Sequence, residues 1–282
     1  MSQAQTYIDR KSAILNKGWF VALLFFIATI AYLWPQATHM ATTLPDGLDS
    51  TDTARQLGEI AHNLLHDPMY IYNSPGLYPL NNDLALNELL IGQGIVIAPV
   101  IWLTGNPILA WNILTFLSFF LSAIAAWLLV RRFTGSSLAG IAAGITYAFS
   151  PWHYGQYGHL GIMAIPYMVL GLYFLVLFLD RSRSSQRLLD RRNLLFLALF
   201  AAFTAFQALA AGYYGYYAAI LYGLYFAYYL LRESGLAAWL SSLVRRRRAT
   251  TVDWRRLVGQ VGLLAIVGIF ALATIYPFLR PY

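Results

Sequence analysis

Three aspartates spaced three residues apart stand out in the stretch LPDGLDSTDTARQ, residues 44–56. Asp46, Asp49 and Asp52 matter because a positioned carboxylate can act as a general base, which takes a proton from a reacting hydroxyl. Aspartates are also favoured where a helix begins, because they cap backbone N–H groups and complement the helix dipole by about 0.3–1 kcal/mol. The same dipole helps to keep a carboxylate ionised, as a general base requires. Both interpretations, helix start and base, stay open for Asp49 and Asp52.

The residues that follow predict an amphipathic helix. In STDTARQLGEIAHNLLH, apolar side chains recur at the i, i+3, i+4, i+7 and i+8 spacing of one helix face: Leu57, Ile60, Ala61, Leu64 and Leu65. A short helix with one apolar face is suited to lie on a membrane surface. We therefore expect the aspartates at the N-terminal end of an interfacial helix.

The composition indicates an integral membrane protein. Of 282 residues, 59% are hydrophobic and 11% are charged, against roughly 25% charged in an ordinary soluble domain. The net charge of +7 does not indicate nucleic-acid binding, because the arginines lie at the ends of apolar segments. The absence of cysteine excludes disulfides and thiolate chemistry. His153 and His159 do not form a recognised metal spacing, so neither a metal nor another cofactor is indicated.

The distribution of lysine and arginine predicts how many apolar runs cross the bilayer. A span needs about 20 residues, and short loops rich in Lys and Arg stay cytoplasmic. If all eight runs cross, 15 of the 19 basic residues lie outside, whereas 17 lie inside if the 86–103 run does not cross. Glu88, Gln93 and Pro99 also interrupt that run, as suits an interfacial or re-entrant helix. The eight runs are 18–35, 86–103, 107–130, 136–150, 160–179, 193–210, 213–231 and 257–276.

The predicted fold is therefore all-α and integral to the membrane, with about seven transmembrane helices. One or two juxtamembrane helices are expected in the first outer loop, 36–106. We expect the chain, 1–282, to form a single transmembrane module of the plasma membrane. Its N-terminus is expected to be cytoplasmic, with the first long loop and the C-terminus outside. Seven of the twelve acids and all five histidines then lie outside, and no acid lies within the seven predicted spans. This pattern argues against an ion-coupled transporter, which usually needs ionisable groups at depth.

Several short motifs, in order, carry a resemblance to a known class of enzymes. They are an Asp after the first span, YP followed by NELLIG, then GNPILAWN, LLVRRFTG and FSPWHYGQYGHL. Together with the long outer loop, they resemble the GT-C class of polyprenyl-phosphate-dependent glycosyltransferases, and more closely its bacterial mannosyltransferase-like members. The resemblance covers residues 44–165 well and the remainder only as hydrophobic helices. Relatives usually continue with further spans or a soluble domain, so the resemblance implies that a C-terminal continuation is missing.

The resemblance implies an inverting sugar transfer from a polyprenyl-phosphate donor to an acceptor hydroxyl at the outer face. Asp49 matches the base of that class, Asp52 and Asp46 are its reserves, and Glu88 matches a second acid that orients the acceptor or the base. A cation would stabilise the departing phosphate, and Arg280 is the preferred candidate. Further substrate-binding residues implied by the same motifs and loops are Arg55, His159, His153, Tyr78 and Asn87. Arg55 has the alternative of an i, i+3 salt bridge with Asp52.

Two further functions remain as alternatives. One is a non-catalytic lipid-handling or scaffold protein of the same fold, whose loop acids serve as helix caps. The other is a flippase-like transporter, which requires a polar path that the predicted spans barely offer beyond Gln207 and Gln260. An enzyme predicts that Asp49, Glu88 and a cation converge, whereas a scaffold predicts that they are dispersed. The expected partners are the lipid-linked sugar and the bilayer, without nucleic acid; the donor sugar and the acceptor are not specified by the sequence.

Overall fold

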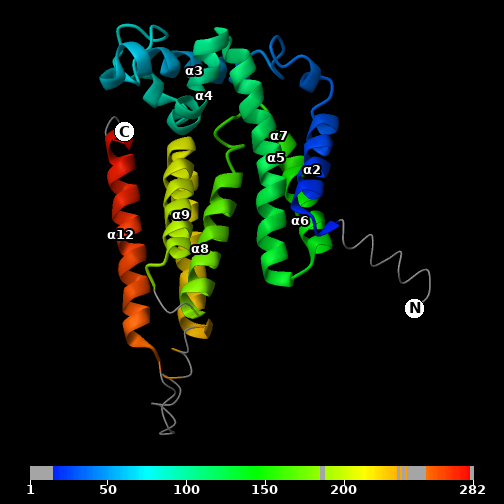
Figure 1. Ribbon diagram of the computed structural model, residues 1–282. Coiled ribbons are helices and arrows are strands. Elements are labelled where there is room, and N and C mark those ends of the chain that lie inside the picture. The colour runs from blue at the N-terminus through cyan, green and yellow to red at the C-terminus, as the bar shows by residue number, and fades with distance from the viewer. Residues whose placement is uncertain (1–14, 185–187, 234–235, 237–238, 240–251, 280–282) are drawn as a thin grey trace, which may run out of the picture.

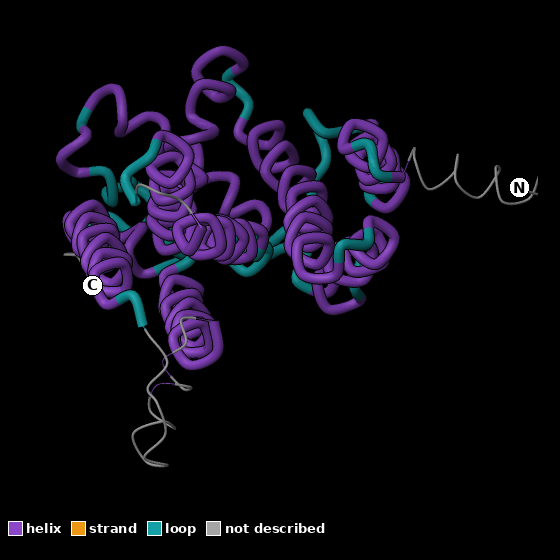
Figure 2. Tube along the Cα trace, turned by 60° about the horizontal axis from the view of Figure 1, so that its bottom comes forward, coloured by secondary structure: helices purple, strands orange, loops and turns teal. Residues whose placement is uncertain are grey.

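The computed structural model describes residues 15–184, 188–233, 236, 239 and 252–279. These residues form helices and loops, without a strand among them, so the all-helical prediction is confirmed for the part described (Figure 2). A bundle of roughly parallel and antiparallel helices fills most of the molecule (Figure 1). Its members are α2 (Gly18–Tyr32), α5 (Pro107–Thr134), α6 (Ser137–Ala148), α8 (Pro166–Ser184), α9 (Arg191–Ala210), α10 (Gly212–Tyr228), continued by the π-helical turn η4 (Tyr229–Glu233), and α12 (Trp254–Leu279).

Three of these helices are long and apolar enough to cross a membrane within the described residues. They are Pro107–Thr134, Arg191–Ala210 and Trp254–Phe278. Helix α2 is apolar but has 15 residues, and α6 has 12, which at 1.5 Å per residue reaches only about 18 Å. The chain is therefore compatible with a membrane protein, and helix length and composition alone identify fewer spans than the seven predicted.

Basic residues gather at one end of the bundle, where several helix ends meet. The guanidinium of Arg132, at the end of α5, forms an ion pair with Asp180 near the end of α8. At the same end, Arg181 forms an ion pair with Asp190 just before α9, over 2.7 Å. Arg256 at the start of α12 donates a hydrogen bond to the carbonyl of Arg183. The basic residues Arg10, Lys11 and 245–248 lie outside the described residues.

The opposite end of the bundle carries the segment 36–106 (Figure 1). This segment contains α3 (Asp49–His66), α4 (Ile91–Thr104) and the short 3₁₀ turns η1 (Gln36–Thr38), η2 (Pro68–Tyr70) and η3 (Asp83–Leu86). The periodicity of the sequence thus predicts α3 correctly: Leu57, Ile60 and Ala61 of its apolar face are buried, whereas Leu65, near its C-terminal end, is 58% exposed. The 86–103 run forms only the 14-residue α4, which packs against α3 and α9 at this end.

Two indole N–H groups attach α3 to its neighbours. Trp111 of α5 donates to the hydroxyl of Thr53 over 2.9 Å, and Trp102 of α4 donates to the carbonyl of Ala61 over 2.8 Å. The bond between Trp111 and Thr53 is buried, and leaving either group there without a partner would cost about 1–3 kcal/mol. The orientation of α3 across the end of the bundle is therefore determined by specific bonds as well as by its apolar face.

Helices α5 and α6 approach closely because glycines replace larger side chains at their contact. A Cβ atom added at Gly144 would lie 2.7 Å from the carbonyl oxygen of Ala123 and 2.5 Å from Cζ of Phe25. Gly140, one turn earlier, faces Trp127 in the same way. This small-xxx-small spacing is the usual means by which helix backbones approach each other in membranes.

The substitution Gly144→Ala is therefore expected to destabilise the bundle. Overpacking of this kind costs about 1–3 kcal/mol, because backbone atoms must move to accept the methyl group. The matched control is Gly223→Ala in α10, where an added Cβ meets no atom within 4 Å. The midpoint of thermal unfolding in detergent, followed by tryptophan fluorescence, should fall for Gly144→Ala and stay or rise for Gly223→Ala. Equal midpoints for the two variants would contradict the close α5–α6 contact.

Candidate functional site

Asp46 caps the N-terminal end of α3. Its Oδ1 accepts hydrogen bonds from the backbone N–H of Leu48 over 2.9 Å and of Ser50 over 3.0 Å. Partial burial opposes ionisation of Asp46, but the bonds from Ser50 and Leu48 outweigh it and lower the pKa of the carboxyl. The capping role that the sequence assigned to Asp49 or Asp52 thus belongs to Asp46, which is less suited to be a reserve base.

Asp52 is held by three side chains. Arg55 forms the expected i, i+3 salt bridge with it over 2.8 Å, Gln56 donates over 3.0 Å, and the amide of Asn87 donates to the same carboxylate. Burial opposes ionisation, but these bonds and the charge of Arg55 together lower the pKa of Asp52. Arg55 also donates to the hydroxyl of Ser74 over 3.1 Å. Asp52 and Arg55 therefore neutralise each other. The ion pair makes Asp52 less suited to act as a base and Arg55 less suited to bind a phosphate.

A cavity of 370 Å³ lies beside this pair. Asp52, Arg55 and Asn87 line it, together with residues of the loop that leads into η3. Tyr78 is strongly exposed in that loop, next to Leu77, which lines the cavity. The structure thus gathers Arg55, Asn87 and Asp52 at one cavity, with Tyr78 at its edge.

Asp49, His159 and Glu88 come together from three segments of the chain. The Oδ2 atom of Asp49 lies 3.5 Å from Nε2 of His159, and Nδ1 of His159 lies 3.7 Å from Oε1 of Glu88. The imidazole therefore stands between two carboxylates. The side chain of Asp49 is 59% exposed and that of Glu88 is 21% exposed. Asp49 is thus the member of the cluster most open to a substrate.

The loop 156–165 positions His159 and Glu88. The backbone N–H of Gly161 donates to Oε2 of Glu88 over 2.8 Å, and a Cβ at Gly161 would lie 2.7 Å from that oxygen. A Cβ at Gly158 would overlap Oδ2 of Asp46. Both glycines were missed as site residues from the sequence, because 73 residues separate Gly161 from Glu88 and no local pattern links them.

The environment of Glu88 shifts its pKa in the direction opposite to the shifts of Asp46 and Asp52. Burial raises the pKa of Glu88, the N–H of Gly161 and the charge of His159 act to lower it, and the charge of Asp49 raises it further. The net pKa lies above the usual 4.5. An acid whose pKa is raised, beside an exposed carboxylate and an imidazole, is suited to accept and return a proton.

Two predicted substrate-binding residues are not placed in this cluster. His153, in the short helix α7 (Pro151–Gly155), is fully buried. Its ring bonds the carbonyl of Ala148 over 2.7 Å and the hydroxyl of Ser118 over 3.2 Å, and burial lowers its pKa. His153 therefore joins α5 and α6 in a buried position, apart from Asp49 and Glu88, and its substrate-binding role stays a prediction. Arg280 lies outside the described residues, and its role stays a prediction.

The titration of Glu88 tests the electrostatics of the cluster. Infrared difference spectra should show one carboxyl that titrates above 4.5 and disappears in Glu88→Gln, while Asp46 and Asp52 titrate below 3.8. Asp49→Asn removes a negative neighbour and should lower the pKa of Glu88, whereas His159→Gln should raise it. The folded chain binds this proton more tightly than the unfolded chain does. Glu88 therefore contributes stability that is complete below pH 4.5 and is lost as pH rises through its folded pKa.

Unchanged spectra in Glu88→Gln would show that the high-pKa carboxyl belongs to another residue. Shifts of the wrong sign in Asp49→Asn or His159→Gln would contradict the contacts of the cluster. The matched control is Asp67→Asn, at the C-terminal end of α3, which should leave the titration of Glu88 unchanged.

Comparisons with known proteins return no relative for this chain. No protein-family model matches it, and no match was found among the curated proteins or the solved structures. Conclusions about function therefore rest on the residues of the chain and their geometry.

Proposed function

We propose that this chain is an inverting glycosyltransferase that moves a sugar from a polyprenyl-phosphate donor to an acceptor hydroxyl. The observation that supports the proposal most directly is the convergence of Asp49 and Glu88 on His159 at the end of the bundle that carries 36–106. The convergence of Asp49 and Glu88 supports an enzyme, and the cation expected beside them, Arg280, lies outside the described residues. Asp49 is exposed, and the capping of α3 is left to Asp46.

The proposed setting is the plasma membrane, with seven spans formed by the bundle helices and a cytoplasmic N-terminus. The clustering of Arg132, Arg181 and Arg256 at one end of the bundle supports this orientation, because basic loops stay in the cytoplasm. The opposite end, with α3 and α4, then faces outward at the level of the lipid headgroups. The shorter helices α2 and α6 would need their flanking residues, or a locally thinner bilayer, to complete a crossing.

In the proposed reaction, Asp49 takes the proton from the acceptor hydroxyl. The hydroxyl oxygen attacks the anomeric carbon of the donor from the face opposite the lipid phosphate. The bond between that carbon and the phosphate oxygen breaks, and the phosphate leaves with the bonding electrons. Attack and departure on opposite faces invert the configuration at the anomeric carbon.

His159 and Glu88 serve Asp49 in this proposal. The imidazole of His159 lies beside Asp49 and orients it, and Glu88 contacts the imidazole from the other side. Arg280 is proposed as the main partner of the departing phosphate, because Arg55 already pairs with Asp52. Asn87 and Tyr78 would contact the substrate from the 370 Å³ cavity and its edge.

The two alternatives find less support. A scaffold protein has no need of an exposed carboxylate beside an imidazole and a second acid. For a transporter, the polar side chains within the bundle should line a path. Instead, Gln207 accepts from the backbone N–H of Met168 over 2.7 Å, and Gln260 donates to Ser182 and to the hydroxyl of Tyr229. Both glutamines thus serve contacts between helices.

Turnover of a lipid-linked sugar in proteoliposomes tests the proposal. The measurement is the release of polyprenyl phosphate from a panel of polyprenyl-phosphate hexoses mixed with candidate acceptors. Asp49→Asn should lower the rate by about 10²–10⁴-fold, as expected for the loss of a general base. Arg280→Ala should also lower it, because the leaving phosphate loses its cation.

The control is Asp67→Asn, in the same loop and at the other end of α3, which should retain full activity. Full activity in Asp49→Asn would exclude the base role. Comparable losses in Asp49→Asn and Asp67→Asn would indicate a general effect of charge on the loop.

A further inference from the structure

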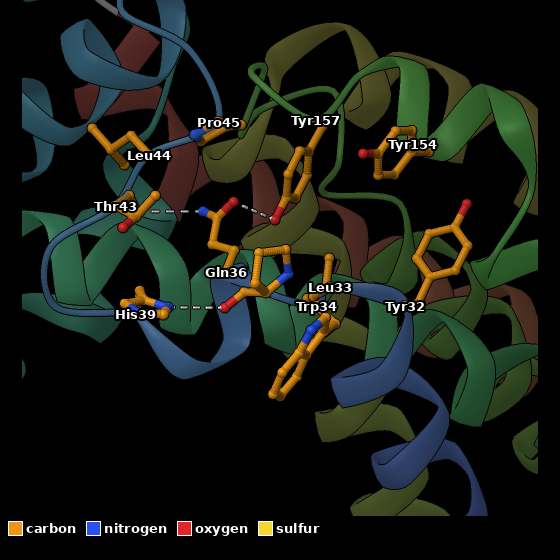
Figure 3. Close-up of a pocket in the computed structure, with 11 residues that line it drawn as sticks. Tyr32, Leu33, Trp34, Gln36, His39, Thr43, Leu44, Pro45, Tyr154 and Tyr157 are labelled. Atoms are coloured by element: carbon orange, nitrogen blue, oxygen red, sulfur yellow. Dashed lines mark hydrogen bonds between the residues drawn. The ribbon is translucent and has the colours of Figure 1, made fainter.

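A second cavity, of 530 Å³, lies between the C-terminal end of α2 and the loop around α7. Its size falls within the range of about 300–1,000 Å³ that is common for small-molecule sites. Figure 3 shows the rings of Tyr32, Tyr154 and Tyr157 on one side and Gln36, Thr43 and His39 on the other, with Trp34 below.

The aromatic rings form a continuous surface along the cavity. The rings of Tyr154 and Tyr157 stack with centroids 5.4 Å apart, and the ring of Tyr32 meets that of Tyr154 edge-on at 5.6 Å. Trp34 is 64% exposed and Tyr154 is 51% exposed, so both present ring faces to a ligand. An aromatic face carries negative potential and attracts the weakly positive C–H groups on the flat side of a pyranose ring.

Polar groups on the other side are held in place for hydrogen bonding. The amide oxygen of Gln36 accepts from the hydroxyl of Tyr157 over 2.8 Å, and its nitrogen donates to the amide oxygen of Asn112. The Nδ1 atom of His39 is hydrogen-bonded to the carbonyl of Pro35 over 3.2 Å, which orients the ring. Amide, hydroxyl and imidazole groups are suited to the hydroxyls of a sugar.

The lining of the cavity carries no permanent charge, which favours a neutral ligand. The residues that line the cavity include no Asp, Glu, Lys or Arg. A phosphate enclosed here would lack a permanent counter-charge, which is costly in a partly desolvated site. A purely hydrocarbon chain would use none of the remaining hydrogen-bonding capacity of the amide, hydroxyl and imidazole groups in the lining.

The cavity adjoins the carboxylate cluster. Pro45 and Tyr157 line the cavity, and their chain neighbours Asp46 and Gly158 contact each other beside Asp49. His159 follows Tyr157 by two residues, which span at most about 7 Å. A ligand in the cavity can therefore extend a hydroxyl toward Asp49.

We propose that this cavity binds a neutral saccharide, through stacking on Trp34 and Tyr154 and hydrogen bonds around Gln36. Its assignment as the acceptor of the sugar transfer rests on the proposed function, whereas saccharide binding itself does not. The substrate class inferred for the acceptor is thus an uncharged sugar unit with a free hydroxyl.

Saccharide binding can be measured without a donor or turnover. The chain is solubilised in a detergent that lacks a sugar headgroup and titrated with methyl glycosides of glucose, mannose and galactose and their disaccharides. Saturation-transfer difference NMR gives the dissociation constant. Trp34→Ala and Tyr154→Ala should each weaken binding about tenfold, because a stacking surface is lost. The matched control is Trp152→Ala, a residue of α7 that is 52% exposed and does not line the cavity.

The outcomes separate this inference from the proposed function. Asp49→Asn should abolish turnover and leave glycoside affinity unchanged. Glycoside binding without any turnover in the wild type would uphold the saccharide site and remove only its assignment as acceptor. The inference is overturned if no glycoside binds, if Trp34→Ala and Tyr154→Ala bind like Trp152→Ala, or if an alkyl phosphate rather than a glycoside occupies the cavity. Retained unfolding midpoints ensure that each variant is folded.

Discussion

The hydrogen bond from the indole of Trp111 to Thr53 is the contact that anchors the segment 36–106 to the end of the bundle. It joins the first turn of α3 to the long helix α5 in a fully buried setting, next to Leu57 and Ile60. Because α3 is held there, its first residue, Asp49, projects at the end of the bundle toward the 156–165 loop. Together with the bond from Trp102 to Ala61, this attachment directs α3 across the end of the bundle and places Asp49 beside His159.

The acids of this region differ in how strongly their surroundings favour the ionised carboxylate. Asp46 and Asp52 are held by hydrogen bonds that favour ionisation, and their pKa values fall. Glu88 is desolvated and faces Asp49, and its pKa rises. Asp49 is left exposed, with the imidazole of His159 beside it. Neighbouring carboxylates of one loop thus differ in the task they suit: two stabilise local structure, one can exchange a proton, and one is free to meet a substrate.

The 370 Å³ cavity and the 530 Å³ cavity also differ, in the charge of the residues that line them. The 370 Å³ cavity has a charged wall in Asp52 and Arg55, whereas the 530 Å³ cavity is aromatic and uncharged. The first suits a ligand with ionic or strongly polar groups, and the second suits a neutral sugar. In the chain, Asp49 lies between Asp46 and Asp52. Asp46 is next to Pro45, which lines the 530 Å³ cavity, and Asp52 lines the 370 Å³ cavity. A reaction between a charged donor and a neutral acceptor fits this placement.

The sequence by itself determined the helical class, the amphipathic face of α3, the short interrupted helix α4 and the separation of basic and acidic loops. These features depend on periodicity and composition, which are local properties of the chain. Only the tertiary structure decided that Asp46 rather than Asp52 caps α3, that His153 is buried, and that Gly161 holds Glu88. It also decided which residues surround each cavity. The contact between Gly161 and Glu88 and the linings of the cavities join positions tens of residues apart, so they depend on how helices pack and no local pattern specifies them. The bonds of Asp46 span only two and four residues, but they depend on the backbone conformation before α3, which the residue types do not specify.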